Sequence, residues 1–158
     1  MKFRPSVVEG IFNSLIVHCL PLIGGLDIGQ VNQIQVLQNK AARIVCSAPP
    51  RAKRLDLFKK VEWLTVQQLI AFHTLLQIFK IRQQKEPKYL YEHLWRDSRN
   101  GRIFVPKHNL SVTAKSFCFR GTSLWNSLPR SLRDMEKLSL FKKEARKWVD
   151  MNVQRFLD

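Results

Sequence analysis

The chain has 158 residues, of which 45% are hydrophobic and 10% are aromatic. This size and composition suit a single folded unit with one core and exclude a disordered tail. Lysine and arginine number 27 against 12 acidic residues, which gives a formal net charge of +15 at pH 7. Such an excess favours a polyanionic partner, first of all nucleic acid. The alternatives are an acidic membrane surface and a basic surface that is only solvated.

The N-terminal segment superficially resembles a targeting signal. Lys2 and Arg4 precede an apolar stretch at residues 11–23. Glu9 and Asn13 interrupt the apolar character, and no small-x-small cleavage site follows. We therefore expect neither a signal peptide nor a membrane span, but a buried amphipathic helix.

The three cysteines, Cys19, Cys46 and Cys118, are odd in number and widely spaced. This pattern excludes a disulfide framework and a zinc knuckle, and it indicates reduced, core-like thiols. We accordingly expect an intracellular protein, located in the nucleus or the cytoplasm.

The first predicted unit, residues 1–47, is a helical hairpin. Apolar residues recur at helical spacing over residues 7–20, and Pro21 ends the run. Asp27 can cap a second helix that reaches Cys46. Its inner stripe is predicted to contain Val31, Ile34, Leu37 or Gln38, Ala41, Ile44 and Val45, and its outer face Gln30, Gln33, Gln35, Lys40 and Arg43.

The second unit, residues 48–95, begins with Pro49 and Pro50, which stop the preceding helix. A basic loop and a short helix at 55–61 should follow. The capping-box spacing of Thr65 and Gln68 then predicts a long helix over 66–84, closed by Pro87, with one or two more turns over 88–95. The stripe of the long helix is predicted to contain Val66, Leu69, Ile70, His73, Leu76 and Phe79.

The third unit, residues 96–158, starts with an exposed basic loop over 96–113, within which 103–105 is predicted as a short strand. Apolar order returns at 117–124. Ser139 should start a last helix whose apolar side carries Phe141, Ala145, Trp148, Val149 and Phe156. The predicted fold is therefore mainly α: a small helical bundle with a basic loop-rich segment and at most a minor strand pair, all in one folded unit.

Three stretches carry a family pattern. Residues 36–44 read VLQNKAARI, residues 63–69 read WLTVQQL, and residues 116–129 read SFCFRGTSLWNSLP. In this order and spacing they resemble the C-terminal region, after the palm and from the thumb onward, of reverse transcriptases from non-LTR, LINE-type retrotransposons. The residues that carry the match are Leu37, Gln38, Asn39, Lys40, Ala41, Arg43 and Ile44, followed by Ser116, Phe117, Arg120, Leu124, Trp125, Asn126, Leu128 and Pro129.

The resemblance implies a part of an RNA-directed DNA polymerase that supports the template and primer duplex. It does not imply an enzyme. The family's Tyr-x-Asp-Asp turn is absent and no two acidic residues are adjacent, whereas polymerase chemistry needs paired carboxylates for two metal ions. We therefore assign no catalytic residue and no cofactor, and we expect a truncated or remnant copy that could act with a full-length reverse transcriptase in trans.

Two groups of basic residues are the candidate nucleic-acid-binding sites. We call Lys40, Arg43, Arg51, Lys53 and Arg54 the first basic cluster, and Lys142, Lys143, Arg146 and Lys147 the second basic cluster. Either could follow the phosphates of RNA or an RNA/DNA duplex without reading bases. The first basic cluster is the better candidate, and its alternative is a solvated basic edge. In the second cluster the pairing of Glu144 with Lys147 favours an ordinary surface face.

Other candidate side chains favour structural roles. Trp125 and Asn126 could orient a nucleic-acid backbone, but a hydrophobic knot of Trp125 with Phe117, Phe119, Leu124 and Leu128 is the favoured interpretation. Burial is likewise favoured for Trp63. His18 and His73 lie on apolar stripes, and His93 and His108 have no cysteine at metal-ligand spacing, so no metal site is predicted.

Two rival functions remain open. In one, the chain is a protein-interaction or assembly module, and the apolar face of the N-terminal hairpin docks onto another chain. In the other, it is a nonfunctional remnant that folds poorly.

Overall fold

The computed structural model describes residues 27–95, 101–105 and 116–152, together with the helical residues Gly10 and Ser14. Within these ranges the chain forms seven helices and no strand. They are α3 (Ile28–Cys46), α4 (Arg54–Val61), α5 (Val66–Gln84), α6 (Lys88–Trp95), α8 (Phe117–Asn126), α9 (Arg130–Arg133) and α10 (Leu138–Met151). The mainly helical fold is thereby confirmed. The rest of the first predicted helix, with Cys19, lies outside the described residues.

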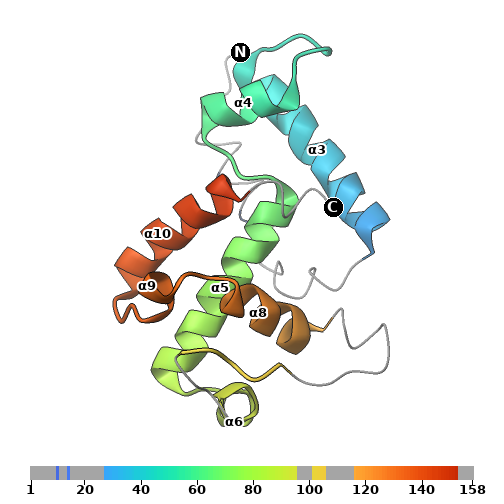
Figure 1. Cartoon of the computed structure of the whole chain (residues 1–158). Helices are drawn as coiled ribbons and strands as arrows, with labels where there is room; N and C mark the ends of the chain where they lie inside the picture. The colour runs from blue at the N-terminus through green and yellow to red at the C-terminus, as the bar shows by residue number, and fades with distance from the viewer. Residues whose placement is uncertain (1–9, 11–13, 15–26, 96–100, 106–115, 153–158) are drawn as a thin grey trace.

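Helix α5 is the centre of the molecule (Figure 1), and α3, α6, α8 and α10 all contact it. The capping box of Thr65 and Gln68 at its start is present as predicted. The prediction of a single apolar stripe was wrong, because helices pack around several sides of α5. Phe72, Leu75 and Ile78 are also buried, whereas His73 is only half-buried.

Helix α3 has the predicted bounds, with Asp27 and Gln30 forming a capping box at its start. Its predicted faces were partly wrong. Gln35 is buried, although we predicted it on the outer face, and Leu37 and Ile44 are 55% and 63% exposed. Gln35 is buried because its side chain accepts a hydrogen bond from the backbone amide of Val66 at the start of α5.

The main core forms where α5, α8 and α10 meet. Trp125 is fully buried there, and its ring contacts Phe141 at a centroid distance of 5.7 Å. Leu128 is buried in the same cluster, against which Phe117 and Leu124 pack. The predicted hydrophobic knot around Trp125 is therefore confirmed for Phe117, Leu124 and Leu128, whereas Phe119 is half-buried and does not belong to this cluster. A smaller core between α3 and α4 contains Trp63, Phe58, Leu57, Ala41 and Ala42, so the predicted burial of Trp63 is confirmed as well.

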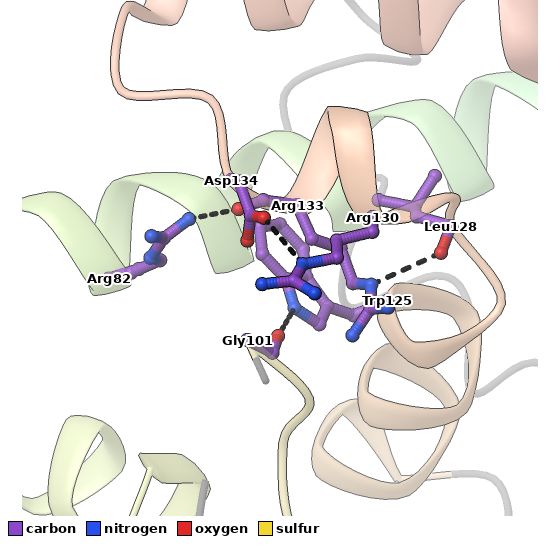
Figure 2. A network of polar contacts seen from close by, with 7 residues as sticks. All are labelled: Arg82, Gly101, Trp125, Leu128, Arg130, Arg133 and Asp134. Atoms are coloured by element: carbon purple, nitrogen blue, oxygen red, sulfur yellow. Dashed lines mark hydrogen bonds and ion pairs between the residues drawn. The ribbon is translucent and has the colours of Figure 1, made fainter. Parts of the chain in front are cut away.

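The segment 101–105 is not a strand, contrary to the prediction for 103–105. Its backbone bonds to side chains of α8 and, through the Phe104 amide, to the carbonyl of Leu94 across 3.3 Å. The backbone amide of Ile103 donates to Asn126 Oδ1 across 2.9 Å, and Asn126 Nδ2 donates to the Ile103 carbonyl across 2.9 Å. Trp125 Nε1 donates to the Gly101 carbonyl across 2.9 Å (Figure 2).

Helix α10 starts one residue before Ser139, with Lys137 at its N-cap. Phe141, Ala145, Trp148 and Val149 are buried as predicted, whereas Phe156 lies outside the described residues. The helix runs along α5. The rings of Phe79 and Phe141 stack at 4.3 Å, and Gln68 Nε2 donates to the Val149 carbonyl across 3.4 Å. The two helices are therefore antiparallel.

Candidate nucleic-acid interface

The first basic cluster lies where α3 ends and α4 begins. Lys40 is exposed on α3, and Arg51 and Lys53 are exposed in the connection between the helices. Arg43 is half-buried, and its Nε is enclosed without a hydrogen-bond partner. Arg54 is the first residue of α4 and is half-buried, so our placement of Arg54 in the loop was wrong. The backbone of Lys53 is extended and ends the loop one residue earlier than predicted.

The second basic cluster covers the outer face of α10, as predicted. Lys142, Lys143, Arg146 and Lys147 are all exposed, opposite the buried apolar side of the helix. Lys147 Nζ lies 2.9 Å from Glu144 Oε1, which confirms the predicted pair. Lys142 and Lys143 have no ion-pair partner among the described carboxylates. Two positive charges of this cluster are therefore uncompensated.

Arg146 links the second basic cluster to α4. Its Nη2 donates to the backbone carbonyl of Glu62 across 2.7 Å, a contact between residues 84 positions apart. Glu62 is the left-handed C-cap of α4, and the last turn of that helix carries the exposed residues Lys59 and Lys60. Sequence reasoning noted neither lysine as a site residue. Both lysines lie near α10 because of a contact between residues far apart in the sequence, which the local spacing of residues cannot predict.

A second link joins α10 to α5. The pKa of His73 lies below its ordinary value of 6.5, first because of burial, then because of the positive charges of Lys142 and Lys80. Positive neighbours disfavour the protonated imidazole, and they do so only over short distances. Lys80 is exposed on α5. A cation of α10 and a cation of α5 therefore both disfavour the protonated form of His73.

Several family-motif residues hold the fold together. Gln38 is fully buried and donates through Nε2 to the Leu64 carbonyl across 2.9 Å. Asn39 accepts from Gln35, and Ala41 is buried against α4. Both polar atoms of the Asn126 side chain bond to Ile103. The interpretation of Asn126 as an orienting group for nucleic acid thus loses its donor and its acceptor.

The remaining motif residues lie at helix starts or on the surface. Ser116 is the N-cap of α8, where its Oγ accepts from the Phe119 amide across 3.4 Å. Pro129 precedes α9 as its N-cap. Arg120 is exposed on α8, and Leu37 is exposed on α3. Pro129 is exposed as well, so a partner could reach the side chains of all three.

Three other arginines serve structure (Figure 2). Arg133 is buried, and its Nε donates to the Leu128 carbonyl across 3.2 Å. Arg82 Nη1 donates to the carbonyl of Arg133, and Arg130 pairs with Asp134 across 3.1 Å. These cations close the turn between α8 and α10. The formal net charge therefore overstates the number of positive charges that are free to bind a polyanion.

The part of the chain that the structure describes contains no group of three potential metal ligands. His18 and His108 lie outside it. None of the helices it defines is long and apolar enough to cross a membrane. No family model, curated protein or solved structure matches the chain.

Proposed function

We propose that the chain binds the phosphate backbone of nucleic acid without reading base sequence. The exposed face of α10 carries the proposal, because Lys142 and Lys143 have no carboxylate partner in the described structure while the opposite side of the helix is anchored in the core. A folded helix that presents unpaired cations can replace the counterions condensed on a polyphosphate. The first basic cluster adds exposed cations at Lys40, Arg51 and Lys53.

The sequence motifs support a retrotransposon origin for this activity. Within an intact reverse transcriptase, such a module would hold RNA or an RNA/DNA duplex by charge and shape. Acting alone, the chain would cooperate with a full-length reverse transcriptase in trans, in the nucleus or the cytoplasm. Because no two acidic residues of the chain are adjacent, we expect the purified protein to extend no primer with magnesium or manganese. Template-dependent extension would contradict this part of the proposal.

The test is the salt dependence of binding to a short mixed-sequence duplex. With about four to five phosphate contacts, the slope of log affinity against log salt should be roughly −4. Removing three cations by the change Lys142→Ala, Lys143→Ala and Lys147→Ala should lower the magnitude of that slope by about two to three units. Replacing Arg51, Lys53 and Arg54 by alanine measures how much the first basic cluster contributes to the slope. Wild-type binding no tighter than that of an unrelated protein with the same net charge would contradict the proposal.

A second function has one observation in its favour. Val36, Leu37 and Ile44 on α3 are each more than half exposed, and so is Leu55 on α4. Exposed apolar side chains on neighbouring helices are typical of protein contact sites. If the chain is an assembly module, sedimentation should detect a concentration-dependent oligomer, and Leu37→Glu should abolish it. A monomer at all concentrations would remove this alternative as self-assembly.

A further inference from the structure

We propose that the nucleic-acid backbone binds one composite basic surface built from three helices, and that α10 is its centre. We define this composite basic surface as Lys59 and Lys60 of α4, Lys80 of α5, and Lys142, Lys143 and Arg146 of α10. The inference rests on the proposed function and specifies its site. It adds Lys59, Lys60 and Lys80, and it leaves the first basic cluster outside the site.

Two independent contacts bring these residues together. Arg146 donates to the carbonyl of Glu62, which directly follows the last turn of α4 with Lys59 and Lys60. The rings of Phe79 and Phe141 stack at 4.3 Å, which places their chain neighbours Lys80 and Lys142 on adjacent parts of α5 and α10. The lowered pKa of His73, to which both lysines contribute, agrees with this placement. Lys142 and Arg146 are one helical turn apart and therefore share a flank of α10. That flank is the one that faces α4 and α5.

The frame beneath the surface is rigid. Phe141 and Phe79 stack in the main core, and Gln68 bonds to the Val149 carbonyl at the other end of the α5 and α10 pair. The cations of α5 and α10 thus stand on helices that contact each other at both ends of the pair, and Arg146 joins α4 to them. A preorganised array loses less conformational freedom on binding than cations in a loop, such as Arg51 and Lys53.

The surface contacts phosphates and not bases. Among the described residues, the large aromatic side chains that are exposed are Tyr89 of α6 and Phe104 of the segment 101–105, and neither belongs to α4 or α10. Phe58, Phe141 and Trp148, which do belong to these helices, are buried. Single-strand binders need exposed aromatic rings on which bases stack. A surface of cations alone fits a duplex, whose phosphates are outside and whose bases are already stacked.

Acidic residues limit the extent of the surface. Glu144 pairs with Lys147, so we do not count Lys147 as a free cation. Asp150 is exposed on α10 and would repel phosphates near the end of that helix. The footprint should therefore run along α10, from Lys142 beside Lys80 to Arg146 beside Lys60, and should end before Asp150.

Fluorescence anisotropy with the full chain and a short labelled duplex tests the proposal. Lys59→Gln with Lys60→Gln, and separately Lys142→Gln with Lys143→Gln, should each weaken duplex binding by about tenfold at moderate salt and lower the salt slope by about two units. The control is Lys85→Gln with Lys88→Gln, which removes two exposed lysines at the α6 end of α5 and should change affinity by less than about threefold. Lys88 pairs with Glu92 across 3.8 Å, whereas Lys85 has no ion-pair partner among the described residues. All substituted side chains are exposed, and circular dichroism melts verify that the variants fold.

The stoichiometry decides between one surface and two sites. One surface predicts one duplex per chain, and combining both pairs of changes should lower the slope by the sum of the separate effects. Two binding events, or a loss confined to Arg51 and Lys53 variants, would overturn the composite surface and leave the proposed function intact. Single strands of the same sequence bound as tightly as duplex would overturn it as well. Binding only to phosphatidylserine vesicles, with no nucleic acid bound, would overturn both the inference and the proposed function.

Discussion

The side-chain amide of Gln38 in α3 donates to the backbone carbonyl of Leu64 across 2.9 Å, 26 positions further along the chain. Both residues are buried. Gln35 donates to Gln38 Oε1 across 2.9 Å and accepts from the backbone amide of Val66 across 2.9 Å. The two glutamines therefore satisfy the backbone where the chain enters α5. Because an unpaired buried polar group is costly, this pairing fixes the position of α3 on α5.

Replacing Gln38 by leucine should destabilise the fold by about 1–3 kcal/mol, although the new side chain is apolar and of similar size. The substitution removes the donor to the Leu64 carbonyl and the acceptor that Gln35 uses. Urea unfolding measures the change in free energy. Gln33→Leu, at an exposed position of the same helix, is the control and should change stability by no more than about 0.5 kcal/mol. Equal stability of the two variants would mean that water or another donor replaces Gln38.

The hydrogen bonds of Gln35 and Gln38 also show which part of the fold could be predicted from the sequence. The ends of α3 and α5 follow from local chemistry, since Asp27 and Thr65 cap their own helices. The burial of Gln35 does not, because a polar side chain at a helix position reads as solvent-facing until its partner is known. That partner is Val66, which is 31 positions away. The same holds for α5, whose several buried sides depend on helices that arrive later in the chain.

The candidate site likewise has one part that the sequence predicts and one part that it does not. Local spacing places Lys142, Lys143, Arg146 and Lys147 on one face of a helix, and the structure has them exposed there. Local spacing could not predict that this face lies near Lys59 and Lys60, because the link between them is the hydrogen bond of Arg146 to the Glu62 carbonyl. A side chain bonding to a helix end has no pattern in either sequence segment. The sequence therefore identified the basic residue types correctly but could not predict which of them lie close together across long sequence distances.

Trp125→Ala should cost about 3–5 kcal/mol, a large part of the stability of a domain of this size. The indole is fully buried, contacts the rings of Trp95 and Phe141, and bonds to the Gly101 carbonyl. Trp125→Phe retains most of the packing but loses the hydrogen bond, so it should cost clearly less. Thermal melts of a cooperatively unfolding protein distinguish the two. A melt unchanged by alanine would mean that the ring is exposed and free to stack on bases.

His73 predicts a dependence of stability on pH. Its pKa in the folded protein lies below the ordinary value of 6.5, so the unfolded chain binds more protons between the two values. The free energy of unfolding should therefore rise with pH through this window and reach its plateau above about 6.5. As pH falls below 6.5, this contribution is lost. His73→Gln should flatten the dependence, as measured by urea unfolding at a series of pH values.

The same histidine reports on the position of α10. Lys142→Gln should raise the pKa of His73 toward 6.5 without reaching it, because burial is the largest cause of the shift and remains. An NMR titration of the imidazole measures this directly. Lys85→Gln, at the far end of α5, should leave the titration unchanged. An unmoved pKa in Lys142→Gln would show that Lys142 does not reach His73, and it would contradict the placement of Lys142 beside α5 in the composite basic surface.

Gly121 of α8 packs against α5 so closely that a methyl group added there would lie 2.8 Å from Cδ1 of Ile78 and 3.4 Å from Cγ2 of Thr74. Alanine favours a helix over glycine by about 1 kcal/mol, but overpacking a tight core costs about 1–3 kcal/mol. Ile78 is fully buried and has little room to move, so the clash should prevail and Gly121→Ala should destabilise the protein.

A double-mutant cycle separates the two effects. Ile78→Val removes the Cδ1 atom that the new methyl group would meet, at a cost of about 0.5–1.5 kcal/mol in the glycine background. In the valine background, Gly121→Ala should then be neutral or stabilising, because the helix preference for alanine remains and the closest contact is gone. Urea unfolding of the four proteins gives the coupling energy. If Gly121→Ala costs the same in both backgrounds, the close approach of α8 to α5 at Ile78 is wrong, and the glycine serves the backbone of α8 alone.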